Sequence, residues 1–92
     1  MRRGSEIDKA LAAVIKELRE EQEVSQEQLA AKARLTASAL SRIEREFNAP
    51  TWTTVVGIAS ALGYGMAEFG ALVDASRERS RVRVEAAAGA EA

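Results

Sequence analysis

The sequence predicts an all-α protein in which five short helices form one small domain, followed by a short C-terminal tail. Ala, Glu, Arg and Leu are among the commonest of the 92 residues, and these amino acids favour helices, whereas aromatic and other strand-forming residues are fewer. Several segments repeat apolar residues at helical spacing, and a capping residue precedes most of them. A chain of this length forms one domain at most and buries only about two thirds of its unfolded surface.

The composition excludes several classes of protein. The chain contains no cysteine and no histidine, so it has no disulfide framework, no thiolate nucleophile, no Ser-His pair and no Cys or His metal ligand. We therefore expect no enzyme, no metal site and no cofactor. No apolar run approaches the roughly 18 residues of a membrane span, and no signal core follows the basic first residues. We expect a cytoplasmic protein that does not contact a membrane.

The charges nearly cancel, but they are unevenly distributed. The 13 basic and 14 acidic residues give a formal net charge of −1, which by itself argues weakly against nucleic acid as a partner. The segment from residue 32 to residue 45 is different, because a single acid, Glu44, stands there against Lys32, Arg34, Arg42 and Arg45. A nearly neutral chain with this distribution can present one basic face.

The first helix is expected at residues 7–22. Its apolar residues recur at i, i+4, i+7 and i+11, the spacing of one helical face, and they are Ile7, Leu11, Val14 and Leu18. Residues 1–6 precede this helix as an N-terminal arm. The folded domain is expected to span residues 7–75.

Capping residues define the second and third helices. Ser25 and Gln28 have the spacing of a capping box, which predicts a short helix over about residues 26–33. Thr36 is placed to cap a third helix over about residues 37–45. The residues expected to face inward from these two helices are Leu29, Ala30, Ala33, Leu40 and Ile43.

The fourth and fifth helices are expected at residues 52–62, between a Thr51 cap and Gly63, and at residues 66–75. Their inward residues are expected to be Trp52, Val55, Val56, Ala59 and Leu62, then Met66, Phe69, Leu72 and Val73. The aromatic residues expected in the core, rather than stacked on nucleic acid, are Phe47, Trp52 and Phe69. The Arg- and Ala-rich residues 76–92 have no core stripe, so we expect a frayed helix end or a flexible tail.

Two short helices joined by a three-residue turn are the hallmark of a helix-turn-helix. Several linked blocks of the sequence resemble the lambda-repressor-like, or Cro-repressor, helix-turn-helix family of DNA-binding regulators, namely SQEQLAAKA at 25–33, LSRIER at 40–45 and VVGIASALG at 55–63. The resemblance covers roughly residues 7–73. It implies a five-helix DNA-binding domain.

The resemblance implies which residues contact DNA. The helix that starts at Ala37 is then the recognition helix, which reads base edges in the major groove from Ala37, Ser38, Ser41 and Arg42. Phosphate contacts are implied for Ser25, Gln26, Arg45, Asn48 and Thr51. Turn and cap chemistry accounts for Asn48 and Thr51 equally well. The resemblance also pairs Glu44 with Arg19 of the first helix in a partly buried structural ion pair.

Two residues depart from the family pattern. Arg34 and Glu46 stand where the family usually has glycine. If position 34 requires a positive φ, a residue other than glycine there lowers the stability of the fold by about 1 kcal/mol. The Glu46 carboxylate would repel a nearby phosphate.

Our preferred interpretation is that the chain is a transcriptional regulator that binds double-stranded DNA as a homodimer. We expect it to repress its own gene. Two modules related by a two-fold axis read half-sites about 34 Å apart in an inverted repeat. The residues expected at the dimer interface are Tyr64, Met66, Phe69, Leu72 and Val73. One alternative is an antitoxin whose tail after Ser76 folds on a toxin protein. Another is a protein-interaction module that uses the same fold without DNA.

Overall fold

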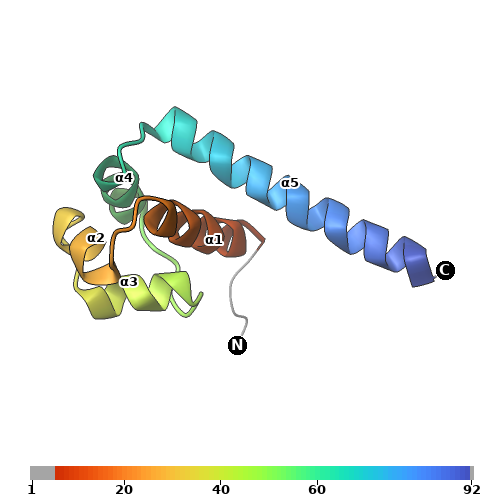
Figure 1. Ribbon diagram of the computed structural model, residues 1–92, viewed down its shortest axis with the longest axis horizontal. Helices are drawn as coiled ribbons and strands as arrows, with labels where there is room; N and C mark the ends of the chain where they lie inside the picture. The colour runs from red at the N-terminus through yellow and green to blue at the C-terminus, as the bar shows by residue number, and fades with distance from the viewer. Residues whose placement is uncertain (1–5, 92) are drawn as a thin grey trace.

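The computed structural model describes residues 6–91, and over that range it contains five helices and no strand (Figure 1). The helices are α1 (Glu6–Glu21), α2 (Gln26–Lys32), α3 (Ala37–Glu44), α4 (Trp52–Ala61) and α5 (Met66–Glu91). The predicted all-α class and the starts of α2 to α5 are confirmed. Five of the six residues of the predicted N-terminal arm lie outside the described residues.

Each helix contributes one large, fully buried side chain to a single core. These side chains are Ile15, Leu29, Leu40, Ile58 and Phe69. α1 packs against α3 and α5, while α2 packs against α3 and α4. Because α1 is covered from two sides, it buries a wider arc than the predicted stripe, and this arc includes Ile15.

The starts of α2, α3 and α4 are stabilised by the predicted caps. The hydroxyl oxygen of Ser25 accepts a hydrogen bond from the Gln28 backbone N–H at 3.0 Å, and the Gln28 side chain accepts the Ser25 N–H at 2.9 Å. The Thr36 and Thr51 hydroxyl oxygens accept backbone N–H groups three residues ahead, at 3.0 and 3.2 Å. Each cap satisfies a helix donor that has no partner within the helix.

Four helices end in the same Schellman motif, in which a residue with positive φ turns the chain. These residues are Glu23 (φ 57°), Arg34 (φ 62°), Glu46 (φ 67°) and Gly63 (φ 91°). In each case the next N–H bonds back to the carbonyl five residues earlier, as from Leu35 to Ala30 at 2.8 Å. The residue after each turn is apolar, and these residues are Val24, Leu35, Phe47 and Tyr64. The predicted positive φ of Arg34 is confirmed, whereas that of Glu23 was missed.

Replacement of Arg34 by glycine is expected to raise the free energy of unfolding by about 1 kcal/mol, because glycine has no Cβ to strain at φ 62°. Arg34→Ala is the matched control, since it removes the same charge and keeps the Cβ. Urea denaturation followed by circular dichroism measures both variants. Equal stability of the glycine and alanine variants would show that the turn is not strained.

The predicted burial of two aromatic residues was wrong. Trp52 is 69% exposed and Phe47 is 54% exposed, whereas Phe69 is buried as expected. Trp52 is the first residue of α4 and Phe47 follows the α3 turn, so both lie at ends of helices. Ile7, in the first turn of α1, is 46% exposed for the same reason. Their apolar character was read correctly, but no helix of the described chain covers them fully.

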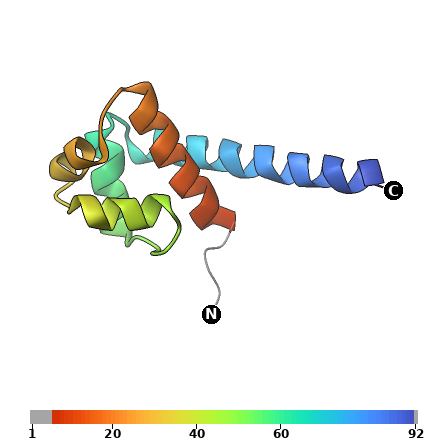
Figure 2. The ribbon, with the colours of Figure 1, turned by 60° about the horizontal axis from the view of Figure 1, so that its bottom comes forward.

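The prediction that the fifth helix ends near Ala75 was also wrong, because α5 continues to Glu91. Figures 1 and 2 show that its C-terminal half extends beyond the other four helices. Among residues 6–89, Ser76 is the last that is buried, and every side chain from 77 to 89 is exposed. Local chemistry supports this half, since Ala, Arg and Glu favour helix and Arg81 pairs with Glu78 at 2.7 Å. We call residues 77–89 the α5 arm.

Truncation of the chain after Ser80 is expected to change the free energy of unfolding by less than about 0.5 kcal/mol, because the removed side chains of the α5 arm contact no core. Circular dichroism should record a loss of helix signal in the folded state. Urea denaturation of the full and truncated chains measures the stability. A loss of several kcal/mol would show that the α5 arm supports the domain.

Candidate nucleic-acid interface

α2, the turn and α3 form a helix-turn-helix pair that is packed through its inner side. Leu29 and Ala30 of α2 are buried with Leu40 and Ile43 of α3 in the common core. The outer side of the pair is polar. Its geometry is therefore set by the core on one side, and the other side is available for contacts.

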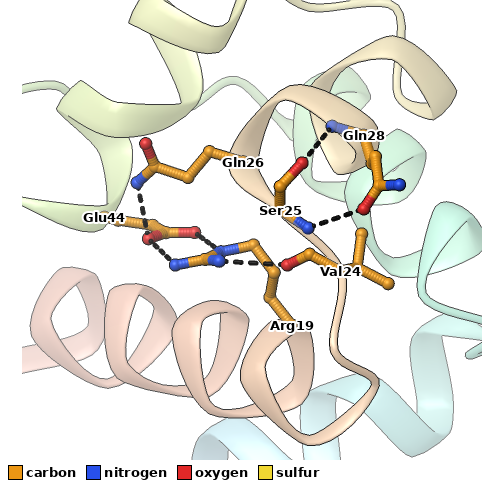
Figure 3. Close-up of polar contacts among 6 residues, drawn as sticks. All are labelled: Arg19, Val24, Ser25, Gln26, Gln28 and Glu44. Carbon is orange, nitrogen blue, oxygen red and sulfur yellow. Dashed lines mark hydrogen bonds and ion pairs between the residues drawn. The ribbon is translucent and has the colours of Figure 1, made fainter.

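A hydrogen-bonded network fixes the end of α3 against α1 and α2 (Figure 3). The Arg19 Nε donates to the Glu44 Oε2 at 2.8 Å, and a terminal nitrogen of Arg19 donates to the Glu44 Oε1 at 3.1 Å. The Gln26 Nε2 donates to the same Oε1 at 2.9 Å. The other terminal nitrogen of Arg19 donates to the Val24 carbonyl at 3.0 Å. The predicted Arg19–Glu44 ion pair is thus present, and it also joins the start of α2.

This network removes the only carboxylate of α3 from the surface. The Glu44 side chain is 3% exposed and the Arg19 side chain is 13% exposed. Hydrogen bonding to Glu44 raises the pKa of the Arg19 guanidinium above its usual value, although burial opposes this shift. The positive charge of Arg19 thus lies directly against the carboxylate of Glu44 inside the domain.

The outward side of α3 carries hydrogen-bonding groups and no free carboxylate. Ser38 and Arg42 are exposed, and Ala37 and Ser41 are half-buried beside them. Arg42 forms no ion pair with any residue that the structure describes. These four residues occupy one helical face, since they are one and four positions apart. The structure therefore brings together all four residues that were predicted to contact bases.

Several of the residues predicted to contact phosphate have structural partners. Ser25 is used in the capping box, and Thr51 donates to the Thr54 hydroxyl at 3.0 Å besides capping α4. Gln26 is held by Glu44 through one of its two amide hydrogens. Asn48 is exposed. The Arg45 guanidinium lies 5.0 Å from the centre of the Phe47 ring, a cation–π contact that sequence reasoning missed.

The five residues predicted at the dimer interface do not share one surface. Met66 lies beside an apolar groove of about 290 Å³, and Phe69 and Val73 are buried beneath it. Tyr64 and Leu72 line a different hollow, which contains charged residues of α1. The prediction that Phe69 and Val73 form a dimer surface is therefore corrected: both belong to the core of their own chain.

Sequence reasoning missed the rim of this groove. Trp52 and Ile7 line it, although both were expected in the core. A signal was available, because each stands in the first turn of a helix, where fewer neighbours cover a side chain. We refer to the groove lined by Ile7, Trp52, Val55 and Met66 as the Trp52 groove.

Two further properties concern the described chain as a whole. Within residues 6–91, no single helix is long and apolar enough to cross a bilayer. α4 and α5 reach the required length and apolar composition only when they are taken together, and the two helices are bent by 99° at the break between them. Over the same residues, no group of three or more acidic side chains is placed to hold a metal ion.

Comparison with known proteins places this geometry in a family. The helix-turn-helix family model matches residues 15–69, which is more than half of the chain. The clp gene regulator ClgR from Corynebacterium glutamicum has a similar structure, with a TM-score of 0.86 at 22% identity over 92% of this chain and 90% of that one. No curated protein gives a significant sequence match.

A second group of similar structures belongs to the restriction-modification controller protein C.Esp1396I. Its tetramer in complex with its natural 35 base-pair operator has a TM-score of 0.76 at 27% identity, over 80% of this chain and 97% of that one. A point variant of the same controller gives a TM-score of 0.72 at 30% identity, over 75% and 90% of the two chains. On the family match, this chain belongs to the lambda-repressor-like helix-turn-helix family, which consists of DNA-binding transcriptional regulators and not of enzymes.

Proposed function

We propose that the chain is a sequence-specific regulator that binds an inverted-repeat operator as a homodimer, with α3 in the major groove. One observation carries this proposal. The single carboxylate of α3, Glu44, is buried in an ion pair, whereas Ser38 and Arg42 are exposed on the opposite side. A helix that enters the groove of a polyanion needs this separation of charge.

The exposed groups of α3 suit base recognition. The Arg42 guanidinium can donate two hydrogen bonds to one guanine, and this contact discriminates by about 1–3 kcal/mol. The Ser38 and Ser41 hydroxyls can donate or accept, so they adapt to several bases. Ala37 presents a methyl group that fits against the methyl of thymine.

Phosphate contacts would fix the register of α3 in the groove. Gln26 is the strongest candidate, because its bond to Glu44 orients the amide and leaves its second hydrogen for a phosphate oxygen. Ser25, Arg45, Asn48 and Thr51 would contribute around it, through their exposed positions at the ends of α2, α3 and α4. Exposed Lys32 and Arg34 add positive charge beside the pair.

A homodimer follows from the size of the contact surface. One helix-turn-helix buries too little surface for tight and selective binding, whereas two modules on one face of DNA read two half-sites about 34 Å apart. The operator-bound tetramer of C.Esp1396I supports double-stranded DNA as the partner of this fold. The proposed regulatory outcome is repression of the chain's own gene.

No observation favours either alternative. The antitoxin interpretation depended on a tail that folds on a toxin, and the α5 arm offers only Val82 and Val84 as large apolar anchors. A module that binds only proteins would not need a reading helix with its carboxylate buried and its arginine exposed.

Selection from random duplex DNA tests the proposal. Bound sites are sequenced, and binding is repeated at two salt concentrations. We expect an inverted repeat with half-site centres about one helical turn apart and an affinity that falls with salt. Weak binding that depends on salt but enriches no motif would contradict sequence reading by α3.

A further inference from the structure

We infer that a second copy of this chain docks on the Trp52 groove, with Trp52 of each copy as the anchor. The inference rests on the proposed homodimer and deepens it by assigning the surface through which the two copies meet. It revises the interface that the sequence predicted, because Met66 still lines the surface, whereas Phe69 and Val73 are buried in its floor.

The Trp52 groove is an open apolar hollow formed by three helices. Ile7 comes from α1, Trp52 and Val55 from α4, and Met66 from α5. Buried Phe69 and Val73 form its floor. The only charged side chain among the described residues that line it is Asp74. Protein interfaces have this composition at their centres, where aromatic residues and methionine are enriched and charges are depleted.

The exposure of Trp52 indicates a protein occupant. Its side chain is 69% exposed, although tryptophan carries the largest apolar surface of any residue. On the order of 170 Å² of this one side chain faces solvent in each copy. Burial of both copies supplies roughly a quarter of the 1,200 Å² that a small specific interface requires. Ile7, Val55 and Met66 add to this area.

The shape of the groove favours a second copy over an unrelated protein. A two-fold interface requires a surface that is complementary to itself, so a projection must lie beside a hollow that receives it. Trp52 projects from the edge of the groove that it lines. A two-fold axis beside Trp52 would place each indole over the groove of the other copy. The near absence of charge prevents repulsion between two identical surfaces.

The position of Trp52 in the chain connects the interface with DNA reading. Trp52 directly follows Thr51, the cap of α4, and a short connection leads back from there to the end of α3. An interface at the start of α4 therefore fixes the spacing between the two α3 helices through a short and ordered path.

The α5 arm is a weaker candidate surface. Its two large apolar residues, Val82 and Val84, are two positions apart, and this spacing places them on opposite sides of a helix. The α5 arm therefore presents no continuous apolar face. This makes Val82, which is 53% exposed, a matched control for Ile7, because both are branched aliphatic residues on a helix surface.

The test compares wild type with Ile7→Glu and Val82→Glu, without DNA, by sedimentation velocity across a wide range of concentration. Trp52 is the only tryptophan, so its fluorescence in the same samples reports on the groove alone. We expect wild type and Val82→Glu to dimerise, with Trp52 emission moving to shorter wavelength as concentration rises. Ile7→Glu should weaken dimerisation roughly thirty-fold or more, because each interface then buries two unpaired carboxylates.

Circular dichroism establishes that each variant is folded, and Trp52→Ala serves as a second groove variant for sedimentation. A dimer that persists in folded Ile7→Glu and Trp52→Ala but is lost in Val82→Glu would overturn the inference and leave the proposed function intact. Wild type that is monomeric both free and on a selected operator would overturn the homodimer itself. Short-wavelength emission from a monomer, lost on deletion of residues 1–5, would assign the groove to the chain's own N-terminal segment and overturn the inference.

Discussion

Replacement of Glu44 by alanine is expected to lower the free energy of unfolding by about 3 kcal/mol, a large share of the roughly 5–15 kcal/mol that stabilises a small domain. The variant leaves the Arg19 guanidinium, whose side chain is 13% exposed, without its carboxylate partner. Gln26 also loses its acceptor. Urea denaturation followed by circular dichroism measures the loss.

A double variant distinguishes the contribution of the ion pair to stability from that of side-chain packing. Arg19→Met with Glu44→Leu replaces both charges with apolar groups of similar size, and its stability is expected to lie within about 1 kcal/mol of wild type. The single variant Arg19→Met should be destabilised in the same way as Glu44→Ala, because it leaves a buried carboxylate. A loss below about 1 kcal/mol in both single variants would show that the pair behaves as a surface ion pair.

Replacement of Arg42 by alanine is expected to remove most sequence discrimination. Each half-site loses about 1–3 kcal/mol of base contact, so the dimer loses at least roughly thirty-fold in operator affinity. Binding to scrambled duplex should change much less, because the phosphate contacts remain. Fluorescence anisotropy with the selected operator and a scrambled duplex, at one salt concentration, measures both affinities.

Two variants serve as controls for this measurement. Arg83→Ala removes the same side chain from the exposed α5 arm and should leave both affinities unchanged. Gln26→Ala should weaken binding to both duplexes by similar factors, because a phosphate contact carries no sequence information. An equal loss on operator and scrambled DNA for Arg42→Ala would assign Arg42 to the backbone instead of the bases.

The helix starts were predictable because their chemistry is local. A cap such as Ser25 bonds to a group three residues ahead, so a short sequence window contains both partners. The helix ends were harder to predict. A positive φ after a helix is usually marked by glycine, as at Gly63, whereas Glu23 adopts the same conformation although it is not glycine. The hydrogen bonds of the Schellman motif and the apolar residue that follows offset the strain at Glu23.

The length of α5 was not predicted, because a helix was expected only where apolar residues pack against a core. Residues 76–92 have no core stripe, and for that reason they were expected to form a frayed helix end or a flexible tail. Helix propensity and close ion pairs, such as Arg81–Glu78, sustain the α5 arm without a core. The α5 arm is therefore stabilised by interactions between residues that are close in sequence, as the capped helix starts are.

The sequence by itself determined the helical class, the starts of α2 to α5 and the position of the helix-turn-helix pair, because period, capping and the linked helix-turn-helix blocks are properties of neighbouring residues. The Arg19–Glu44 pair followed from family resemblance, since its partners are 25 positions apart. Periodicity predicted most of the core, such as Leu29 and Leu40, but only the tertiary structure decided which members of the apolar stripes stay exposed. Trp52 and Phe69 look alike in sequence, but one stands at the edge of the helix assembly and the other at its centre. Burial depends on which helices cover a side chain, and no local pattern records this.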